Sequence, residues 1–127
     1  MQDYAATTGN ITVIAKSVYL DGRSDQLAKK FVFAYFITIE NHGTERVQLL
    51  RRHWQIRDGN GEMMEVEGEG VIGHQPVIAP GGKHEYSSYS VLRTFEGSME
   101  GKFLMERPDG VRFSVAIPRF ALRASAN

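Results

Sequence analysis

Hydrophobic and polar residues alternate along much of the chain with the period of two that indicates β-strands. Helical periodicity is hard to find, whereas short runs of β-branched and aromatic residues recur between turn signals. The expected strands cover residues 10–20, 30–41, about 47–57, 63–67 and 83–92, followed by two hairpin arms over 99–105 and 111–117. The pattern predicts an all-β protein.

Turn residues indicate how these strands connect. Residues 57–62 read Arg-Asp-Gly-Asn-Gly-Glu, which contains two dipeptides typical of tight hairpin turns. Pro108, Asp109 and Gly110 form a similar turn signal between the last two strands. About seven short strands at this spacing predict a two-sheet antiparallel β-sandwich rather than a closed barrel.

The strand around Trp54 has one residue that breaks the alternation. Leu50, Trp54 and Ile56 share one phase, and Arg52 falls on the same apolar side. A β-bulge or a buried ion pair would accommodate Arg52 there. We expect Trp54 to lie in the core between the sheets, where truncating so large an aromatic side chain would cost about 3 to 5 kcal/mol.

Length and composition restrict the function classes. The 127 residues fit one domain, with a patterned core over about residues 10–122. Lys plus Arg and Asp plus Glu number 15 each, which argues against bulk nucleic-acid binding. No secretory signal or apolar run of about 20 residues occurs, so we expect no membrane insertion. The absence of cysteine fits a reducing compartment, and we expect a cytoplasmic protein.

The segment Gly68–Pro76 contains Gly-x-Gly-x-x-Gly, a pattern found in dinucleotide sites. Such a site needs the glycines to join a strand to a helix, and Pro76 follows Gly73 too closely for that helix. We interpret Gly68, Gly70 and Gly73 as residues that supply positive φ or close backbone approach in a loop crossing between the sheets. In an alternative interpretation, successive loop amides form an anion-binding nest.

Other candidate groups form no complete site. The four histidines are His42, His53, His74 and His84. They lack the spacing of paired metal ligands, so no metal site and no cofactor are predicted. Acidic residues of the next strand are expected on a solvated edge: Glu62, Glu65, Glu67 and Glu69. The serines of residues 87–90 are expected on a solvated face, because no nucleophile elbow surrounds them. With no catalytic motif present, we expect no enzymatic activity.

Several short elements occur in an order that resembles the ApaG (CorD) family of bacterial proteins. The match runs from about Ile11 to Leu122. It comprises Arg52-His53-Trp54, Asp58-x-x-Gly61, Gly70-Val71-x-Gly73-x-Gln75-Pro76, Pro80-Gly81, Gly97-x-Met99-x-Gly101 and Ile117-Pro118-x-Phe120. The resemblance implies an immunoglobulin-like or fibronectin type III-like sandwich, in agreement with the strand pattern.

The resemblance implies less about activity. The family is named for a gene neighbour encoding a diadenosine tetraphosphate hydrolase and is linked to cobalt resistance and magnesium efflux, without established catalytic residues. Related domains occur in eukaryotic F-box and DNA-polymerase-interacting proteins. Because such different assemblies reuse the domain, the resemblance favours an interaction surface over a shared enzyme.

These observations lead to three functional hypotheses. The first is a non-enzymatic binding module whose loop 68–82 and adjoining strand edge contact a protein partner. Its glycines would set the loop shape, and its expected contacts are Val71, Ile72, Gln75 and Pro76. The alternative is a nucleotide or small-anion sensor of the diadenosine polyphosphate type, with phosphate held by loop amides together with Arg51, Arg52 or His74. A divalent-metal site has the least support from ligand spacing.

Overall fold

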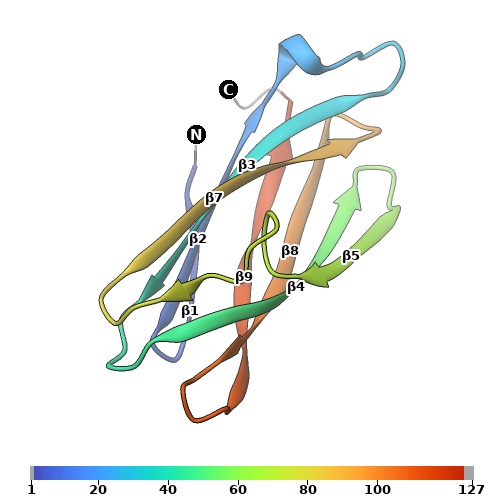
Figure 1. Ribbon diagram of the computed structural model, residues 1–127. Coiled ribbons are helices and arrows are strands. Elements are labelled where there is room, and N and C mark those ends of the chain that lie inside the picture. The colour runs from blue at the N-terminus through green and yellow to red at the C-terminus, as the bar shows by residue number, and fades with distance from the viewer. Residues whose placement is uncertain (1, 125–127) are drawn as a thin grey trace.

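The computed structural model describes residues 2–124, so residues 1 and 125–127 of the predicted single domain lie outside the described part. The described chain is a sandwich of two antiparallel sheets (Figure 1). One sheet has the order β1-β2-β3-β7, formed by Tyr4–Thr8, Ile11–Tyr19, Phe31–Asn41 and Lys83–Leu92. The other has the order β5-β4-β8-β9, formed by Met63–Glu69, Val47–Asp58, Glu96–Glu106 and Arg112–Arg123.

The predicted sandwich is confirmed, and the structure adds two short strands to the expected set. β1 precedes the predicted core, and its sequence, Tyr-Ala-Ala-Thr-Thr, contains no large aliphatic residue that would give a clear alternation. β6, Val77–Ile78, pairs with β4 over two residues between Pro76 and Pro80, where the sequence predicts an unpaired loop. One 3₁₀ turn, η1, covers Asp21–Arg23. Within residues 2–124, no helix has the length and apolar character needed to cross a membrane.

Trp54 lies at the centre of the core, as predicted. Its side chain is 2% exposed. The Trp54 ring meets Tyr35 of the opposite sheet at 5.3 Å between ring centroids and Phe120 of β9 at 5.9 Å, both edge-on. Edge-to-face aromatic contacts of this kind stabilise a core beyond the area they bury.

A β-bulge resolves the position of Arg52. The pairing of β4 with β8 shifts register between Leu49 and Arg51. Leu49 is therefore fully buried and Leu50 only half-buried, which corrects the expectation that Leu50 points into the core. Beyond the bulge, Arg52 keeps the inward phase of Trp54 without an ion pair among the described residues.

Edge strand β7 turns its polar face inward. Tyr86 and Ser88 pair with the buried residues Ile37 and Tyr35 of β3, and directly paired residues of adjacent strands point to the same side of a sheet. Ser90, on the same face, is 7% exposed, so the prediction of solvated serines is wrong there. Tyr89 and Val91, on the opposite face of β7, are exposed instead.

Asp58 ties the two sheets together at one end. Its carboxylate accepts hydrogen bonds from the Thr94 hydroxyl and from the backbone amides of Gly59, Arg93 and Thr94. Partial burial acts to raise the pKa of Asp58, but these hydrogen bonds outweigh it and hold the pKa below its usual value. The turn after β4 is thereby fastened to the turn between β7 and β8.

Candidate functional site

The Gly-rich loop, residues 68–76, ends in a tight turn. The Val71 amide donates to the His74 carbonyl at 2.7 Å, and the His74 amide donates to the Val71 carbonyl at 3.0 Å. The two central residues have positive φ, 47° at Ile72 and 75° at Gly73, as in a type I′ turn. Val71 is buried, whereas Ile72 at the tip is 56% exposed.

Ile72 is the unusual residue of this turn. Positive φ is a genuine outlier for a β-branched residue and costs roughly 1 to 3 kcal/mol. The other non-glycine residue with positive φ within the described part is Lys29, an unbranched residue in a polar connection. Strain of this kind persists only where the surroundings enforce it, and it clusters at functional sites.

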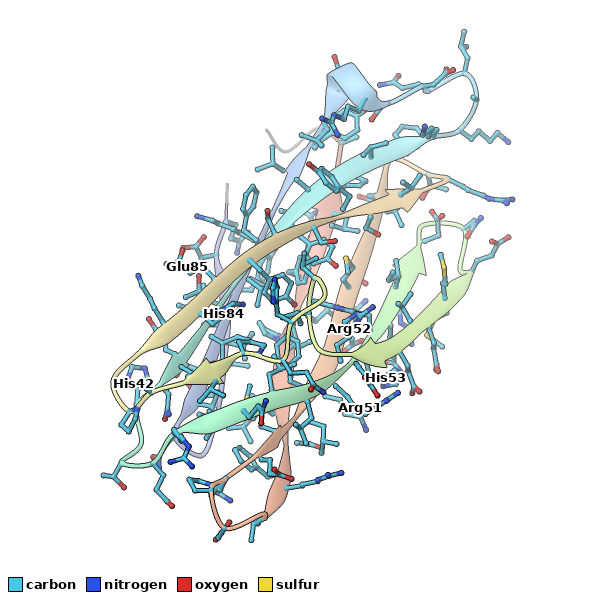
Figure 2. The ribbon with its side chains drawn as sticks, viewed as in Figure 1. His42, Arg51, Arg52, His53, His84 and Glu85 are labelled. Carbon is cyan, nitrogen blue, oxygen red and sulfur yellow. The ribbon has the colours of Figure 1, made fainter. Side chains whose placement is uncertain are left out.

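Hydrogen bonds from β4 and from the loop itself enforce the conformation. Arg52 Nη1 donates to the carbonyls of Glu69 and Gly70, each at 3.0 Å. Gln75 Nε2 donates to the Leu50 carbonyl at 2.9 Å, and Gln48 Nε2 donates back to the Gln75 carbonyl at 3.1 Å. Figure 2 shows Arg52 beside the yellow-green loop. The loop is therefore fixed to β4 along its length.

The three loop glycines have the properties expected of them. Gly70 has φ 63°, and a Cβ there would overlap the His74 carbonyl oxygen. Gly73 has φ 75° and open space around it. A Cβ on Gly68 would press against the Arg52 guanidinium at 2.9 Å. The loop runs from β5 in one sheet towards β7 in the other, as the sequence predicts.

The same geometry limits phosphate binding by the loop. The amides of Gly70, Val71 and His74 donate to carbonyls of Leu50, His74 and Val71, so they are not directed at a ligand. Arg51 and Arg52 alternate along β4, with Arg51 exposed and Arg52 lining the space between the sheets. The structure therefore does not bring the two predicted phosphate contacts together.

Exposed apolar side chains gather around the loop and the neighbouring strand edges. Ile72 and Val77 are both exposed on the segment between β5 and β7. A shallow pocket of about 180 Å³ lies between the ends of β5 and β7, and it is lined in part by exposed Met63, Met64 and Val91. Met63, Met64 and Val91 thus expose apolar surface where the ends of edge strands β5 and β7 meet.

An inter-sheet cavity of about 260 Å³ lies beneath the loop. Ile72 and Gly73 line it from the loop, and Arg52 and Trp54 line it from β4. Further lining comes from both sheets: Tyr35, Ile56, Val66, Val71, Tyr86, Ser88, Tyr89 and Met99. Sequence reasoning missed this cavity because its walls come from strands far apart in the chain.

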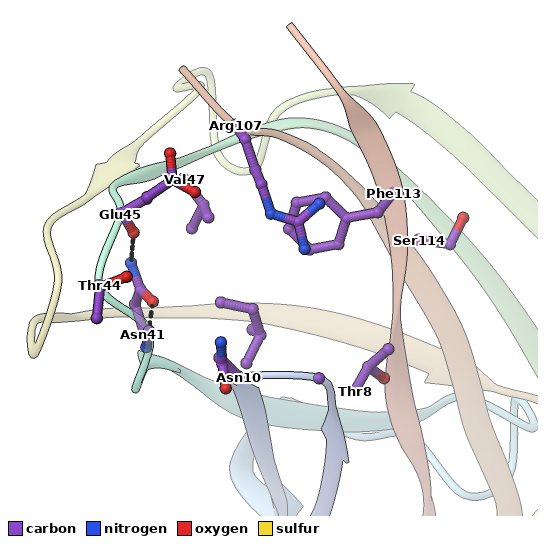
Figure 3. Close-up of a pocket in the computed structure, with 12 residues that line it drawn as sticks. Thr8, Asn10, Asn41, Thr44, Glu45, Val47, Arg107, Phe113 and Ser114 are labelled. Carbon is purple, nitrogen blue, oxygen red and sulfur yellow. Dashed lines mark hydrogen bonds between the residues drawn. The ribbon is translucent and has the colours of Figure 1, made fainter. Parts of the chain in front are cut away.

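A second cavity, the Asn41 pocket, has a similar volume of about 240 Å³ (Figure 3). Asn41 is 1% exposed there. Its Nδ2 donates to the carbonyls of Glu45 at 2.8 Å and Ile78 at 3.0 Å, and its Oδ1 accepts from the Gly43 amide. Arg107 covers the Phe113 ring at 4.1 Å from the ring centroid.

A group of potential metal ligands lies on the outer face of β4 and β5. His53 Nε2 is 3.4 Å from a Glu65 carboxylate oxygen and 3.5 Å from one of Glu67. One potential ligand atom from each of the three residues lies within 4.8 Å of the other two. The predicted solvated edge is confirmed, since both glutamates are exposed. Sequence reasoning missed this grouping, although the hairpin register, which pairs His53 with Glu67, would have revealed it.

His84 of β7 lies close enough to His74 of the loop for the two side chains to affect each other's charge. His84 lies on the inner face of β7, with its ring 6.1 Å from that of Tyr86 (Figure 2). Partial burial lowers the pKa of His84, and the nearby His74 of the loop lowers it further. Protonation of His84 is therefore less favourable than that of a fully exposed histidine.

Comparison with known proteins gives a consistent assignment. The ApaG domain model matches residues 21–107. A Protein ApaG from Paramagnetospirillum magneticum is 48% identical over 94% of this chain and 92% of that protein, and one from Pseudomonas paraeruginosa is 48% identical over 91% and 92%. The crystal structure of the putative ApaA protein from Bordetella pertussis superposes with a TM-score of 0.89 at 38% identity, covering 92% of this chain and 95% of the other. The chain therefore belongs to the ApaG family.

Proposed function

We propose that this protein is a non-enzymatic, cytoplasmic binding module that contacts a protein partner through loop 68–82 and the adjoining strand edge. The observation that carries the proposal is Ile72, which is exposed and held at positive φ by a loop clamped to β4. An apolar anchor that is already ordered loses little conformational entropy on binding. Val77, which belongs to the same loop 68–82, is exposed as well and offers a second apolar contact.

Photo-crosslinking in cells tests this proposal. A photoreactive amino acid is placed at position 72 or 77, and at position 27 as a control, because Leu27 is 99% exposed in a connection between strands. We expect one discrete protein adduct from positions 72 and 77 and none from position 27. The same background adducts from all three positions would contradict the proposal.

A pair of glycine variants links the adduct to the loop shape. Gly73→Ala should weaken the adduct without unfolding the domain, because a Cβ at Gly73 has open space although φ is positive. Gly61→Ala is the matched control, since Gly61 also has positive φ and open space but lies in the turn between β4 and β5. An equal loss of crosslinking in both variants would point to general destabilisation and contradict a specific role of the loop.

The rival hypothesis of a nucleotide or diadenosine polyphosphate sensor has less support, because three loop amides are already bonded within the protein. An amide NMR titration with ATP and diadenosine tetraphosphate at fixed ionic strength separates the two hypotheses. Saturable shifts over residues 68–74 would favour the sensor. Unchanged spectra at millimolar ligand would support the protein-binding module.

The family's link to cobalt and magnesium directs one further test to His53, Glu65 and Glu67. A cobalt titration of the labelled protein should shift the His53 resonances selectively if these residues hold a divalent cation. Equal responses from all four histidines would indicate non-specific binding.

A further inference from the structure

Two residues that line the inter-sheet cavity carry buried polar atoms without partners among the described residues. Trp54 Nε1 and the Tyr86 hydroxyl have no hydrogen-bond partner among the described residues, and both side chains line the cavity. Buried polar groups are paired in the great majority of native structures, since leaving one unpaired is costly. Two unpaired donors in the walls of the cavity favour a guest that supplies hydrogen-bond acceptors.

The charge around the cavity selects the kind of guest. The Arg52 guanidinium lines the cavity, and no aspartate or glutamate is among the lining residues. Only Nη1 of Arg52 makes the hydrogen bonds to loop carbonyls, and a guanidinium has five N–H donors. An anion would supply the opposite charge that Arg52 lacks within the described residues.

The other polar groups also act as donors. Burial raises the pKa of the Tyr35 phenol, against smaller opposing effects of its hydrogen bond with Ser88 and of Arg52. Burial raises the pKa of Tyr86 as well, and the neighbouring Tyr35 adds to the rise. Both phenols therefore keep their protons at neutral pH, and the Trp54 indole can only donate. The polar part of the cavity is thus rich in hydrogen-bond donors.

The volume of the cavity and its apolar lining restrict the uncharged part of the ligand. Apolar side chains line much of the cavity, among them Ile56, Val66, Val71 and Met99. Its volume of about 260 Å³ is below the range of about 300 to 1,000 Å³ of drug-sized ligand pockets, yet a cavity of about 150 Å³ already accepts benzene. The walls suit a compact ring or short hydrocarbon body, and the volume is too small to enclose a nucleotide.

We propose that this cavity binds a small organic carboxylate with an apolar, aromatic body, whose charged end is held by Arg52, the Tyr86 hydroxyl and the Trp54 indole N–H. The inward polar face of β7 agrees with this role, because the same face supplies Tyr86 and Ser88 to the cavity. The site lies between the sheets rather than on the loop amides. It does not depend on the protein partner proposed above.

The single tryptophan provides a direct test. Because Trp54 is the only tryptophan, its indole N–H gives one cross peak in the spectrum of the ¹⁵N-labelled full chain. The chain is titrated with benzoate, and in parallel with benzyl alcohol and inorganic phosphate at the same ionic strength, to about 10 mM, which covers millimolar dissociation constants. We expect a saturable shift of the Trp54 peak with benzoate, with affinity at least about tenfold above that for either control ligand.

Two tyrosine variants make the test specific. Tyr86→Phe keeps the ring that fills its place and removes only the hydroxyl, and it should weaken benzoate binding roughly fivefold to tenfold. Tyr4→Phe is the matched control, because Tyr4 lies on β1 and does not line the cavity. It should leave benzoate binding unchanged.

Three results would overturn the proposal. Equal affinity for benzoate and benzyl alcohol would show a purely apolar cavity. Saturable binding of phosphate in preference to benzoate would show a site for inorganic anions. No saturable response to benzoate, phenylacetate or butyrate would leave ordered water as the partner of the two polar atoms.

Discussion

The inter-sheet cavity and the Asn41 pocket have nearly equal volumes, about 260 and 240 Å³, but they differ in how their buried polar groups are paired. In the Asn41 pocket, the buried amide uses both donors and its oxygen within the fold. In the inter-sheet cavity, Trp54 Nε1 and the Tyr86 hydroxyl are left without partners among the described residues. Pairing, rather than volume, distinguishes a cavity that supports the fold from one that suits a ligand.

The largest expected effect concerns the Gly-rich loop that lies above the inter-sheet cavity. Gly70→Ala should lower the free energy of unfolding by about 3 to 4 kcal/mol, because the new Cβ combines positive φ with overlap on the His74 carbonyl oxygen. Gly73→Ala should cost only about 1 kcal/mol, since its Cβ meets nothing. Urea unfolding of both variants measures the difference. Equal losses would mean that the loop relaxes more easily than its hydrogen bonds indicate.

The second test removes the paired polar group of the Asn41 pocket. Asn41→Ala should cost about 3 kcal/mol in urea unfolding, because three hydrogen bonds are lost and the Ile78 carbonyl loses its Asn41 donor. Asn60→Ala is the control, since Asn60 accepts one bond from the Glu62 amide in an exposed turn and should cost less than about 1 kcal/mol. Similar values for both variants would contradict the structural role of the pocket.

The third test removes an unpaired polar group from the inter-sheet cavity, where we expect the change in unfolding free energy to have the opposite sign. Tyr86→Phe in the ligand-free protein should leave the free energy of unfolding unchanged or raise it by up to about 1 kcal/mol, because the hydroxyl removed has no partner. Thermal unfolding with and without benzoate checks both states. A loss as large as that of Asn41→Ala would show that the Tyr86 hydroxyl is bonded in the folded protein.

The smallest expected effect depends on pH. The pKa of His84 is below 6.5 in the folded protein, so the unfolded chain binds a proton more readily as the pH falls. The contribution of neutral His84 to stability is fully present above about pH 6.5 and is lost as the pH falls through the lower folded-state pKa. His84→Gln should flatten the decline of unfolding free energy in that window, while His42→Gln should not. An identical slope in all three proteins would exclude this contribution.

Sequence alone predicted the two-sheet fold, the central position of Trp54 and the role of the loop glycines, because these depend on local alternation and turn chemistry. It missed which face of β7 points inward, since alternation fixes a period but not a side. That side is set by the pairing of Tyr86 with Ile37, about fifty residues away. The inter-sheet cavity and the grouping of His53 with Glu65 and Glu67 were missed for the same reason: both arise from strand register.

The strand order has a consequence for how the chain folds. The second neighbour of β3 is β7, which follows β4, β5 and β6 in the sequence. In the same way, β4 pairs with β8, which comes after β5, β6 and β7. Neither sheet is a contiguous segment, so we expect a single cooperative transition and folding in milliseconds to seconds, as for other proteins of high contact order. During synthesis, a chain that ends before β7 would expose the apolar edge strand β3, which is a template for aggregation.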